Sequence, residues 1–246
     1  TGHSTPVVWE DHIFLTATQP HGEKLGPPAP QPSGAHNNMD AHRKHKFIVV
    51  AISRKTGKIL WQTTVRDTRP QGSTHESGTW ASPSPVTDGR HIYAFFGSNG
   101  LYCLDFDGKV FWEKDLGEMI VKHGHGEGAS PAIHGDILIV NWDHEGDSFI
   151  VALSKKTGEE LWRVPRDEHT SWATPLVVEH DGRSQIITNA TRRVRSYDGK
   201  NGELIWETGG MTPNAIPSPV AAGGVVYLIS GFRGNALLAI PLASAS

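Results

Sequence analysis

The sequence has little of several features that define broad classes of protein. It contains one cysteine, Cys103, among 246 residues, which excludes a disulfide within the chain. No apolar run approaches the roughly 20 residues that a membrane-spanning helix needs. A net charge of -3 gives no electrostatic reason to expect a nucleic acid as partner. We therefore expect no transmembrane segment and no nucleic-acid binding.

Familiar catalytic motifs are missing as well. The sequence has no G-x-S-x-G nucleophile elbow, no H-E-x-x-H zinc motif, no phosphate-binding G-K-[ST] loop and no G-x-G-x-x-G dinucleotide fingerprint. The absence of these motifs does not exclude catalysis, because loop-rich folds assemble active sites from residues that lie far apart in sequence.

What the sequence does have is a repeated pattern. A short apolar run leads into a polar turn with glycine at its apex, and a second short run follows and ends in tryptophan. The glycine suits a tight turn, which requires a positive φ that is costly for other residues. The pattern predicts strand, turn and strand in four places: Ala51 to Trp61, Cys103 to Trp112, Ala152 to Trp162 and Ser196 to Trp206.

A second feature recurs upstream of these copies, a small or hydroxyl residue followed by proline. The prolines after the first copy are roughly 44 to 48 residues apart, close to the length of a four-stranded propeller blade, and the series is Pro6, Pro83, Pro131, Pro175 and Pro219. We therefore predict an all-β fold, a β-propeller of four-stranded antiparallel blades, with five blades begun in this chain and residues 1–246 forming one partial propeller domain.

The best-defined unit runs from Ser82 to Leu116. After a first strand that contains the Ser-Pro-Ser-Pro-Val segment, we expect strands at 91–96, 101–104 and 110–114, with Asn99-Gly100 as a two-residue hairpin turn. The last unit ends after the apolar run 236–242, without a fourth strand. Since a propeller closes by pairing its ends, we expect this chain to be part of a larger ring.

The first unit contains an insertion of about thirty residues relative to the others. Residues 19–46 are rich in proline and histidine. Because proline cannot donate to a strand ladder, this segment is predicted to form a long exposed loop between the second and third strands of the first blade.

The glycine turn followed by a Trp strand resembles the PQQ-like β-propeller repeat, whose pattern is close to A-x-D-x-x-T-G-x-x-x-W. Ala152, Thr157, Gly158 and Trp162 match it, and the resemblance covers most of the chain. Ser154 stands where the pattern prefers aspartate. The resemblance implies that one tryptophan per copy packs between neighbouring blades, which gives four structural blade-docking residues: Trp61, Trp112, Trp162 and Trp206.

The family includes quinoprotein dehydrogenases, which hold pyrroloquinoline quinone (PQQ) and Ca²⁺ on the propeller axis, and non-catalytic bacterial propellers similar to BamB. The dehydrogenases place a vicinal disulfide against the quinone, and Cys103 alone cannot form one. We therefore expect no cofactor and a non-catalytic scaffold, periplasmic or secreted, that binds a protein or small ligand at its loop faces. The alternative is a quinoprotein-like or metal-dependent oxidoreductase with its site at the propeller axis, in which case PQQ with Ca²⁺ is the expected cofactor.

Histidines precede the first strand of several units, where loops are expected to surround one mouth of the central channel. His125 and His169 stand six residues before a repeat proline, and His75 and His123 stand eight before. Neutral imidazoles suit Zn²⁺, Cu²⁺ or Fe²⁺, so these four residues are our candidate metal ligands. The other interpretation is a solvated loop rim that binds nothing.

Two tryptophans occupy equivalent positions near the same predicted mouth. Trp80 and Trp172 each precede a repeat proline by three residues. Together with His125 and His169 they are candidate ligand-binding residues, since an indole offers a flat surface for a ligand. Packing beneath the loops explains them equally well.

Two further groups suggest metal binding. The sequence Asp143-His-Glu-Gly-Asp147 resembles the start of a Ca²⁺ loop but lacks the later bidentate glutamate, so a solvated loop is the alternative. The insertion carries His36, His42 and His45, for which a surface loop is the default interpretation.

Overall fold

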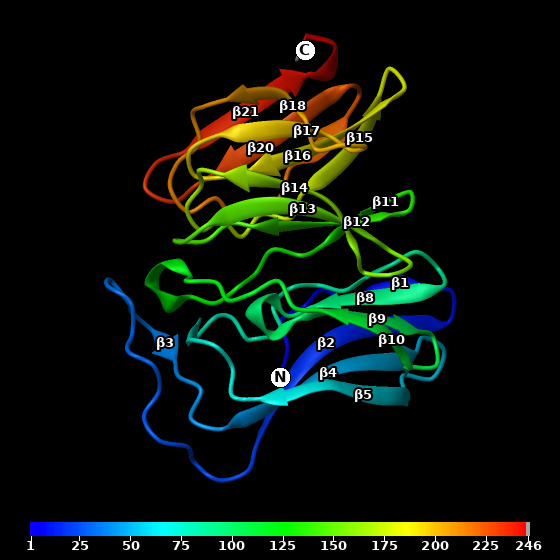
Figure 1. Cartoon of the computed structure of the whole chain (residues 1–246), viewed down its shortest axis with the longest axis vertical. Helices are drawn as coiled ribbons and strands as arrows, with labels where there is room; N and C mark the ends of the chain where they lie inside the picture. Colours follow the sequence, from blue (N-terminus) through cyan, green and yellow to red (C-terminus); the bar gives the residue numbers. More distant parts are fainter. Residues whose placement is uncertain (245–246) are drawn as a thin grey trace. The chain divides into compact units, whose positions relative to one another are not determined.

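Short alternating strands separated by glycine turns produce a series of antiparallel sheets. The computed structural model describes residues 1–244 and divides into two compact units, residues 1–128 and 129–246 (Figure 1). Each unit is described by itself. No helix among the described residues is long and apolar enough to cross a membrane.

The first unit contains two four-stranded sheets and one short strand pair. The first sheet has the order β1-β2-β4-β5, with β1 (Val7–Trp9), β2 (His12–His21), β4 (Lys44–Ser53) and β5 (Ile59–Thr68). The second sheet has the order β7-β8-β9-β10, with β7 (Val86–Thr87), β8 (His91–Phe95), β9 (Leu101–Asp105) and β10 (Val110–Lys114). The short pair joins β3 (Asn38–Met39) to β6 (Thr74–His75).

The second unit continues the same plan. One sheet contains β11 (Ala132–His134), β12 (Ile137–Trp142), β13 (Ser148–Ser154) and β14 (Glu160–Arg166). The next contains β15 (Leu176–His180), β16 (Arg183–Asn189), β17 (Val194–Asp198) and β18 (Leu204–Thr208). The last described sheet has three strands, β19 (Val220–Ala222), β20 (Val225–Ser230) and β21 (Ala236–Pro241).

This architecture confirms the predicted all-β fold of four-stranded antiparallel sheets. Within the larger sheets neighbouring strands follow one another in the chain, except that β3 lies in the connection between β2 and β4; β3 itself pairs with the more distant β6. In the first unit the central strands of both sheets contribute to one buried cluster, which includes Phe14, Phe47, Ile92 and Leu104. Side chains alternate between the two faces of each strand, so the inward-facing apolar residues of the two sheets are buried against one another.

The Trp residues of the repeat lie against glycine turns. The indole Nε1 of Trp61 donates a hydrogen bond of 2.7 Å to the carbonyl oxygen of Phe106. A Cβ on Gly108, which has φ of 84°, would lie 2.8 Å from the Trp61 ring. Trp162 stands in the same relation to Gly202, where a Cβ would lie 2.6 Å from the indole. Glycine is therefore required in these turns both for its φ and for the approach of the preceding sheet's tryptophan.

The other two repeat tryptophans have different surroundings. Trp206 packs against a buried cluster that contains Val226 and Leu228 of β20. Trp112 lies with its ring centroid 6.0 Å from that of Tyr93.

Three details differ from the sequence predictions. The first strand of the second sheet, β7, is only Val86–Thr87, so most of the Ser-Pro-Ser-Pro-Val segment lies outside it. Asn99-Gly100 does not form a two-residue hairpin, because β8 and β9 are joined through a 3-10 turn, η1 (Gly97–Asn99), which brings Phe95 opposite Leu101. Residues 19–21 and 44–46 are not loop but the paired ends of β2 and β4. Pro20 is tolerated there because β1 pairs only with residues 12–14 of β2, so the proline lies on a free strand edge.

Candidate functional site

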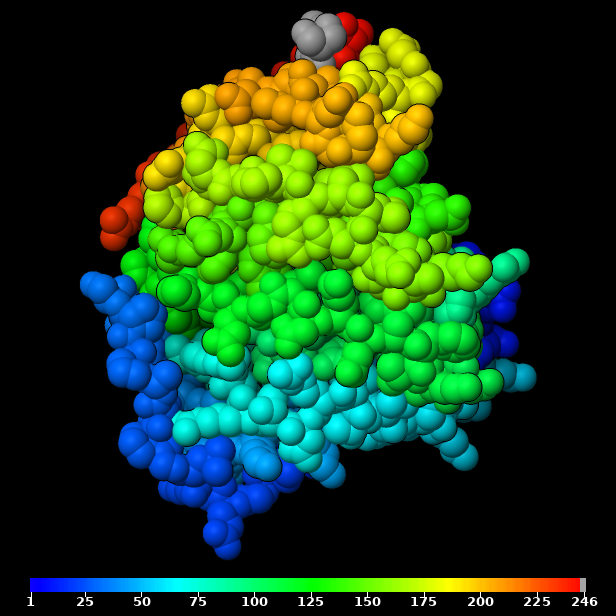
Figure 2. Space-filling view, viewed as in Figure 1, coloured from blue at the N-terminus to red at the C-terminus, as the bar shows by residue number. Residues whose placement is uncertain are grey.

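The insertion, residues 22–43, is attached to the first unit by the short pair of β3 and β6. Asn38 is opposite His75 and Met39 is opposite Thr74. The side-chain amide of Asn38 also donates to the carbonyl oxygen of His123 at 2.7 Å. Figure 1 shows β3 away from the sheet of β2, β4 and β5, and Figure 2 shows the insertion (blue) at the surface. The insertion therefore has a fixed attachment at the level of His36, two residues before β3.

A glycine-rich segment, residues 122–126, lies against the other side of β6. The backbone N–H of His75 donates to the carbonyl oxygen of His125 at 3.1 Å, and the Ser73 hydroxyl donates to that of Gly124 at 2.8 Å. Gly124 and Gly126 have φ of 66° and 84°, and a Cβ on either would come within 2.6 Å of a hydroxyl oxygen of β6 or of the residue before it. The alternation of glycine and histidine therefore lets the backbone approach closely while presenting imidazoles.

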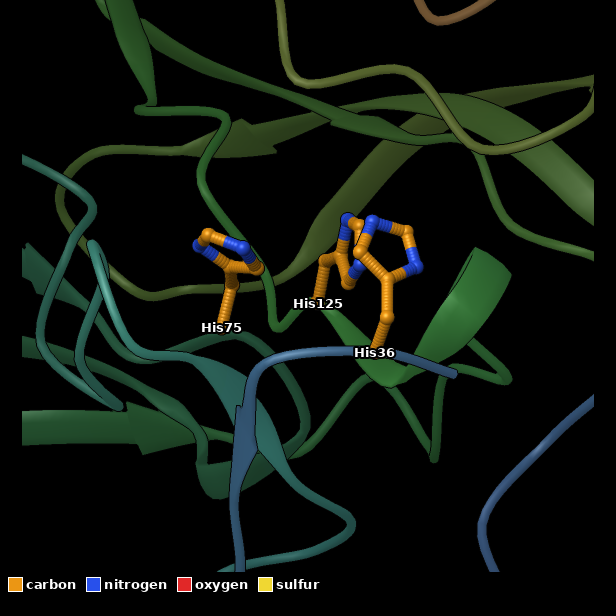
Figure 3. Close-up of side chains that lie close together, drawn as sticks. All are labelled: His36, His75 and His125. Atoms are coloured by element: carbon orange, nitrogen blue, oxygen red, sulfur yellow. The ribbon is translucent and has the colours of Figure 1, made fainter. Parts of the chain in front are cut away.

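These segments bring three histidines together (Figure 3). His36, His75 and His125 each offer one ring nitrogen, and these nitrogens all lie within 4.8 Å of one another. The ring centroid of His125 is 4.6 Å from that of His36 and 4.8 Å from that of His75. In Figure 3 the three side chains rise from three different segments on the same side of the ribbon. We call these three residues the histidine cluster.

The hydrogen bonds of the cluster fix which nitrogens are available. His36 Nδ1 lies 2.8 Å from the carbonyl oxygen of Gly34, which can only accept, so Nδ1 carries the proton and Nε2 keeps its lone pair. His75 Nδ1 lies 2.7 Å from the hydroxyl oxygen of Ser77 and accepts a hydrogen bond of 3.2 Å from the Ser77 backbone N–H. Nε2 of His125 is buried and has no hydrogen-bond partner among the described residues. A buried nitrogen without a partner is uncommon in proteins and needs an explanation.

The electrostatics of the cluster keep His125 neutral. Burial, together with the nearby rings of His36, His75 and His123, lowers the pKa of His125 to about 4. A protonated imidazole would lose hydration and face three other rings that can carry positive charge. At neutral pH the ring is therefore an acceptor, the form that binds metals.

A cavity of about 260 Å³ lies in the same unit. Its apolar wall includes Trp80, Phe96 and Ile120, and the insertion contributes residues 29–32. Gly124 and Gly126 also line it, so the segment that carries His125 forms part of the wall.

One carboxylate, Glu127, lines the cavity. It accepts a hydrogen bond of 2.7 Å from the backbone N–H of Ser98 and another from the Ser98 hydroxyl. Burial raises the pKa of Glu127 to about 7, against the opposing effect of these hydrogen bonds. The cavity therefore offers an apolar surface with one carboxyl group that is held by its neighbours.

The structure places the predicted site residues in different surroundings. His75 and His125 lie together, and the ring of His123 lies beside them, with its centroid 5.4 Å from that of His125. His123 Nδ1 lies 3.3 Å from the carbonyl oxygen of Ser33. The sequence does not place His36 with the candidate metal ligands, because the default interpretation of the insertion is a surface loop. Its position beside the cluster depends on the pairing of β3 with β6, for which a two-residue strand gives no sequence signal.

His169 belongs to the second unit. Its Nδ1 lies 3.1 Å from a carboxylate oxygen of Glu145, and its Nε2 lies 2.9 Å from a guanidinium nitrogen of Arg192. Trp80 lines the cavity, and Trp172 belongs to the second unit, where its backbone N–H donates to the carbonyl oxygen of Ala215 at 2.9 Å.

Two carboxylates of the acidic loop after β12, those of Asp143 and Glu145, are engaged by protein groups. Both oxygens of Asp143 accept hydrogen bonds from Arg166, at 2.7 and 3.0 Å, and the side chains of this pair are fully buried. An oxygen of Glu145 accepts from the backbone N–H and the hydroxyl of Thr170. These partners occupy both oxygens of Asp143 and one oxygen of Glu145, which a Ca²⁺ ion would otherwise have to bind.

The residues present do not fit a quinone held against a vicinal disulfide. Cys103 is the single cysteine of the sequence and is buried in β9. Burial raises the pKa of its thiol to about 12, so it is not a reactive thiolate at neutral pH. We derive no chemistry through PQQ and Ca²⁺ for this chain.

The succession of four-stranded antiparallel sheets defines a β-propeller protein. The chain belongs to the PQQ-like repeat propellers, because residues 45–246 match the family model described as outer membrane protein assembly factor BamB. No curated protein matches the chain.

Solved structures agree on the fold. BamB from Moraxella catarrhalis is similar with a TM-score of 0.57 and 15% identity, over 82% of this chain and 59% of that one. The C-terminal WD40 domain of Sif2 is similar with a TM-score of 0.55 and 12% identity, over 98% of this chain and 58% of that one. The chain therefore spans about three fifths of the length of these structures, and at these identities the likeness shows the fold alone.

Proposed function

We propose that this chain is a non-catalytic binding propeller that works outside the cytoplasm, in the periplasm or as a secreted protein, and holds a partner at the cavity of its first unit. The cavity carries this proposal. Its wall combines the indole of Trp80 with Ile120, whose side chain is 62% exposed. Exposed apolar side chains around a concave site are typical of surfaces that bind a partner.

A segment of a partner protein suits the cavity better than a drug-sized ligand. Its volume of about 260 Å³ is below the roughly 300 to 1,000 Å³ of pockets that enclose drug-sized ligands. One or two apolar side chains of a partner would fill it, with Trp80 as the aromatic anchor that such interfaces favour. The family description, an assembly factor for outer membrane proteins, supports both a protein partner and a site outside the cytoplasm.

Photo-crosslinking in the cells that produce the protein tests this proposal. We expect a photoreactive residue at position 120 to capture a protein partner, and Trp80→Ala to abolish the product. The matched control is position 59 in β5, where Ile59 is similarly exposed, at 55%, but does not line the cavity. Equal capture from both positions, or capture that survives Trp80→Ala, would contradict binding at the cavity.

A second candidate function, a metal-dependent oxidoreductase, is favoured by the histidine cluster, because the segment that carries His125 also lines the cavity. Turnover of alcohols or aldehydes with an artificial electron acceptor, in the presence of Zn²⁺, Cu²⁺ or PQQ with Ca²⁺, distinguishes the two functions. We expect none above that of the denatured protein. Turnover that disappears in Trp80→Ala but persists in His42→Ala would replace the binding proposal.

A further inference from the structure

We propose that His36, His75 and His125 bind one divalent transition-metal ion of the zinc type and thereby fasten the insertion, residues 22–43, to the first unit. Each residue offers one ring nitrogen, and all three nitrogens lie within 4.8 Å of one another. Three imidazoles with a fourth position left to water form a familiar Zn²⁺ coordination set, and imidazole also suits Cu²⁺ and Ni²⁺.

The neighbours of the rings orient them as metal ligands are oriented. A ligating histidine usually donates its second ring N–H to a carbonyl, a carboxylate or water, which fixes the tautomer. His36 does this through Nδ1 to the carbonyl oxygen of Gly34 at 2.8 Å. His75 is positioned by Ser77, whose hydroxyl oxygen lies 2.7 Å from Nδ1 and whose backbone N–H donates to Nδ1 at 3.2 Å. Binding through Nε2 therefore requires a proton on Nδ1 that the Ser77 hydroxyl accepts in place of the backbone contact.

The third histidine supplies an observation that is independent of the first two. Nε2 of His125 is buried and has no hydrogen-bond partner among the described residues. Its lone pair or proton is therefore unsatisfied without a ligand, which costs free energy in a folded protein.

The distances require a small closure. In a tetrahedral Zn²⁺ site with Zn–N bonds of about 2.0 to 2.1 Å, the nitrogens are roughly 3.4 Å apart. His75 and His125 are held by the backbone hydrogen bond of 3.1 Å between them. His36 is exposed and belongs to the insertion, so its side chain can make most of the adjustment. Metal binding is therefore expected to draw the insertion toward β6.

This closure reaches the cavity. Residues 29–32 of the insertion form part of its wall, and Gln31 accepts hydrogen bonds from Asn38 and Ser73 beside the cluster. An ion that holds His36 therefore also holds the wall to which a partner would bind. This consequence rests on the proposed function, whereas the metal site itself does not.

The test is a titration of the tag-free chain, stripped with a chelator, with Zn²⁺ by calorimetry, together with metal analysis after dialysis. We expect one ion per chain. Loss of a residue that orients a metal ligand typically weakens binding 10- to 100-fold, and we expect Ser77→Ala to have an effect of about this size. We expect a larger loss of Zn²⁺ affinity in each of the three ligand variants, His36→Ala, His75→Ala and His125→Ala. Co²⁺ should give the visible spectrum of a four-coordinate site.

His42→Ala is the matched control, since His42 belongs to the same insertion and is exposed. It should bind Zn²⁺ as the unaltered chain does. His36→Ala is the decisive variant, because an exposed loop side chain can be removed without unfolding the unit. Binding that survives His36→Ala, or that falls equally in His42→Ala, would overturn the site, as would the absence of stoichiometric binding. A failed crosslink at position 120 with intact Zn²⁺ binding would overturn the partner proposal alone.

Discussion

Single histidines in the first unit differ sharply in what surrounds them. His45 is 6% exposed, and its ring lies edge-on to the indole of Trp80, with 4.7 Å between centroids. Its Nδ1 is buried without a hydrogen-bond partner among residues 1–244. Burial lowers the pKa of His45 to about 4, helped by the positive charges of the amino terminus and His21. His45 therefore behaves as a neutral core aromatic rather than as an ionisable surface group.

This environment makes the stability of the fold depend on pH. The unfolded His45 has a pKa of about 6.5, so below that pH the unfolded chain gains a proton that the folded chain refuses. The free energy of unfolding should be unaffected by His45 above pH 6.5 and should fall by about 2 kcal/mol from this residue between pH 6.5 and 5.

His45→Phe removes the titrating group but keeps a ring against Trp80. Urea unfolding of both proteins at pH 7 and pH 5 checks the prediction, and the variant should lose about 2 kcal/mol less on acidification. Parallel losses in the two proteins would show that His45 is protonated as easily in the fold as in the unfolded chain.

At the scale of elements, a buried ion pair connects strands of two sheets in the second unit. Arg166, at the end of β14, binds both oxygens of Asp143 after β12, and its guanidinium also donates to the hydroxyls of Thr188 in β16 and Tyr197 in β17. Removing one member leaves the other charge buried without its counter-ion, which typically costs 3 to 5 kcal/mol.

We therefore expect Asp143→Ala to lower the free energy of unfolding by about 3 to 5 kcal/mol. Glu160→Ala is the matched control, because the Glu160–Arg163 pair is just as short, at 2.7 Å, but about one third exposed. That change should cost less than about 1 kcal/mol. Denaturant unfolding measures both variants, and similar losses would mean that burial of the first pair carries no penalty.

The strands were predictable from sequence because their signals are local. Alternating apolar residues and glycine turns predicted β8, β9 and β10 to within about one residue of their observed bounds. The prediction for the turn after β8 was wrong. Asn99-Gly100 is a strong signal for a two-residue hairpin, but Glu127, from a loop distant in sequence, accepts a hydrogen bond from Ser98 in this turn. Local pattern cannot report such a contact.

The candidate site was only partly predictable for the same reason. The repeat register singled out His75 and His125, which the structure brings together, but it also singled out His169, which belongs to the second unit. His36 joins the cluster through the two-residue strand β3, a pairing that composition and periodicity do not reveal. The positions of residues in a regular repeat can be predicted from the sequence, whereas the position of a residue on an insertion is known only from the folded structure.

At the scale of the whole molecule, the last described sheet exposes one apolar face. Strand pairing places Val220 opposite Tyr227 and Ile229 opposite Leu237, and all four side chains are exposed, with Leu237 at 69%. A contiguous apolar face of this kind favours association. We expect the isolated chain to self-associate as its concentration rises, and Leu237→Lys to reduce this.

Sedimentation velocity over a range of concentrations measures this behaviour. Lys200→Ala, a change on an exposed turn of the preceding sheet, should leave the association unchanged. A chain that stays monomeric at all concentrations, or that associates equally as Leu237→Lys, would contradict the role of this face.

Amide hydrogen exchange with and without Zn²⁺ tests the central claim, that a metal ion in the histidine cluster fastens the insertion to the cavity of the first unit. We predict slower exchange in residues 22–43 and 122–126 when Zn²⁺ is present, no change in the sheets of the second unit, and no effect of Zn²⁺ in His36→Ala. Exchange in these segments that is the same with and without Zn²⁺, at concentrations that saturate any binding, would contradict the account.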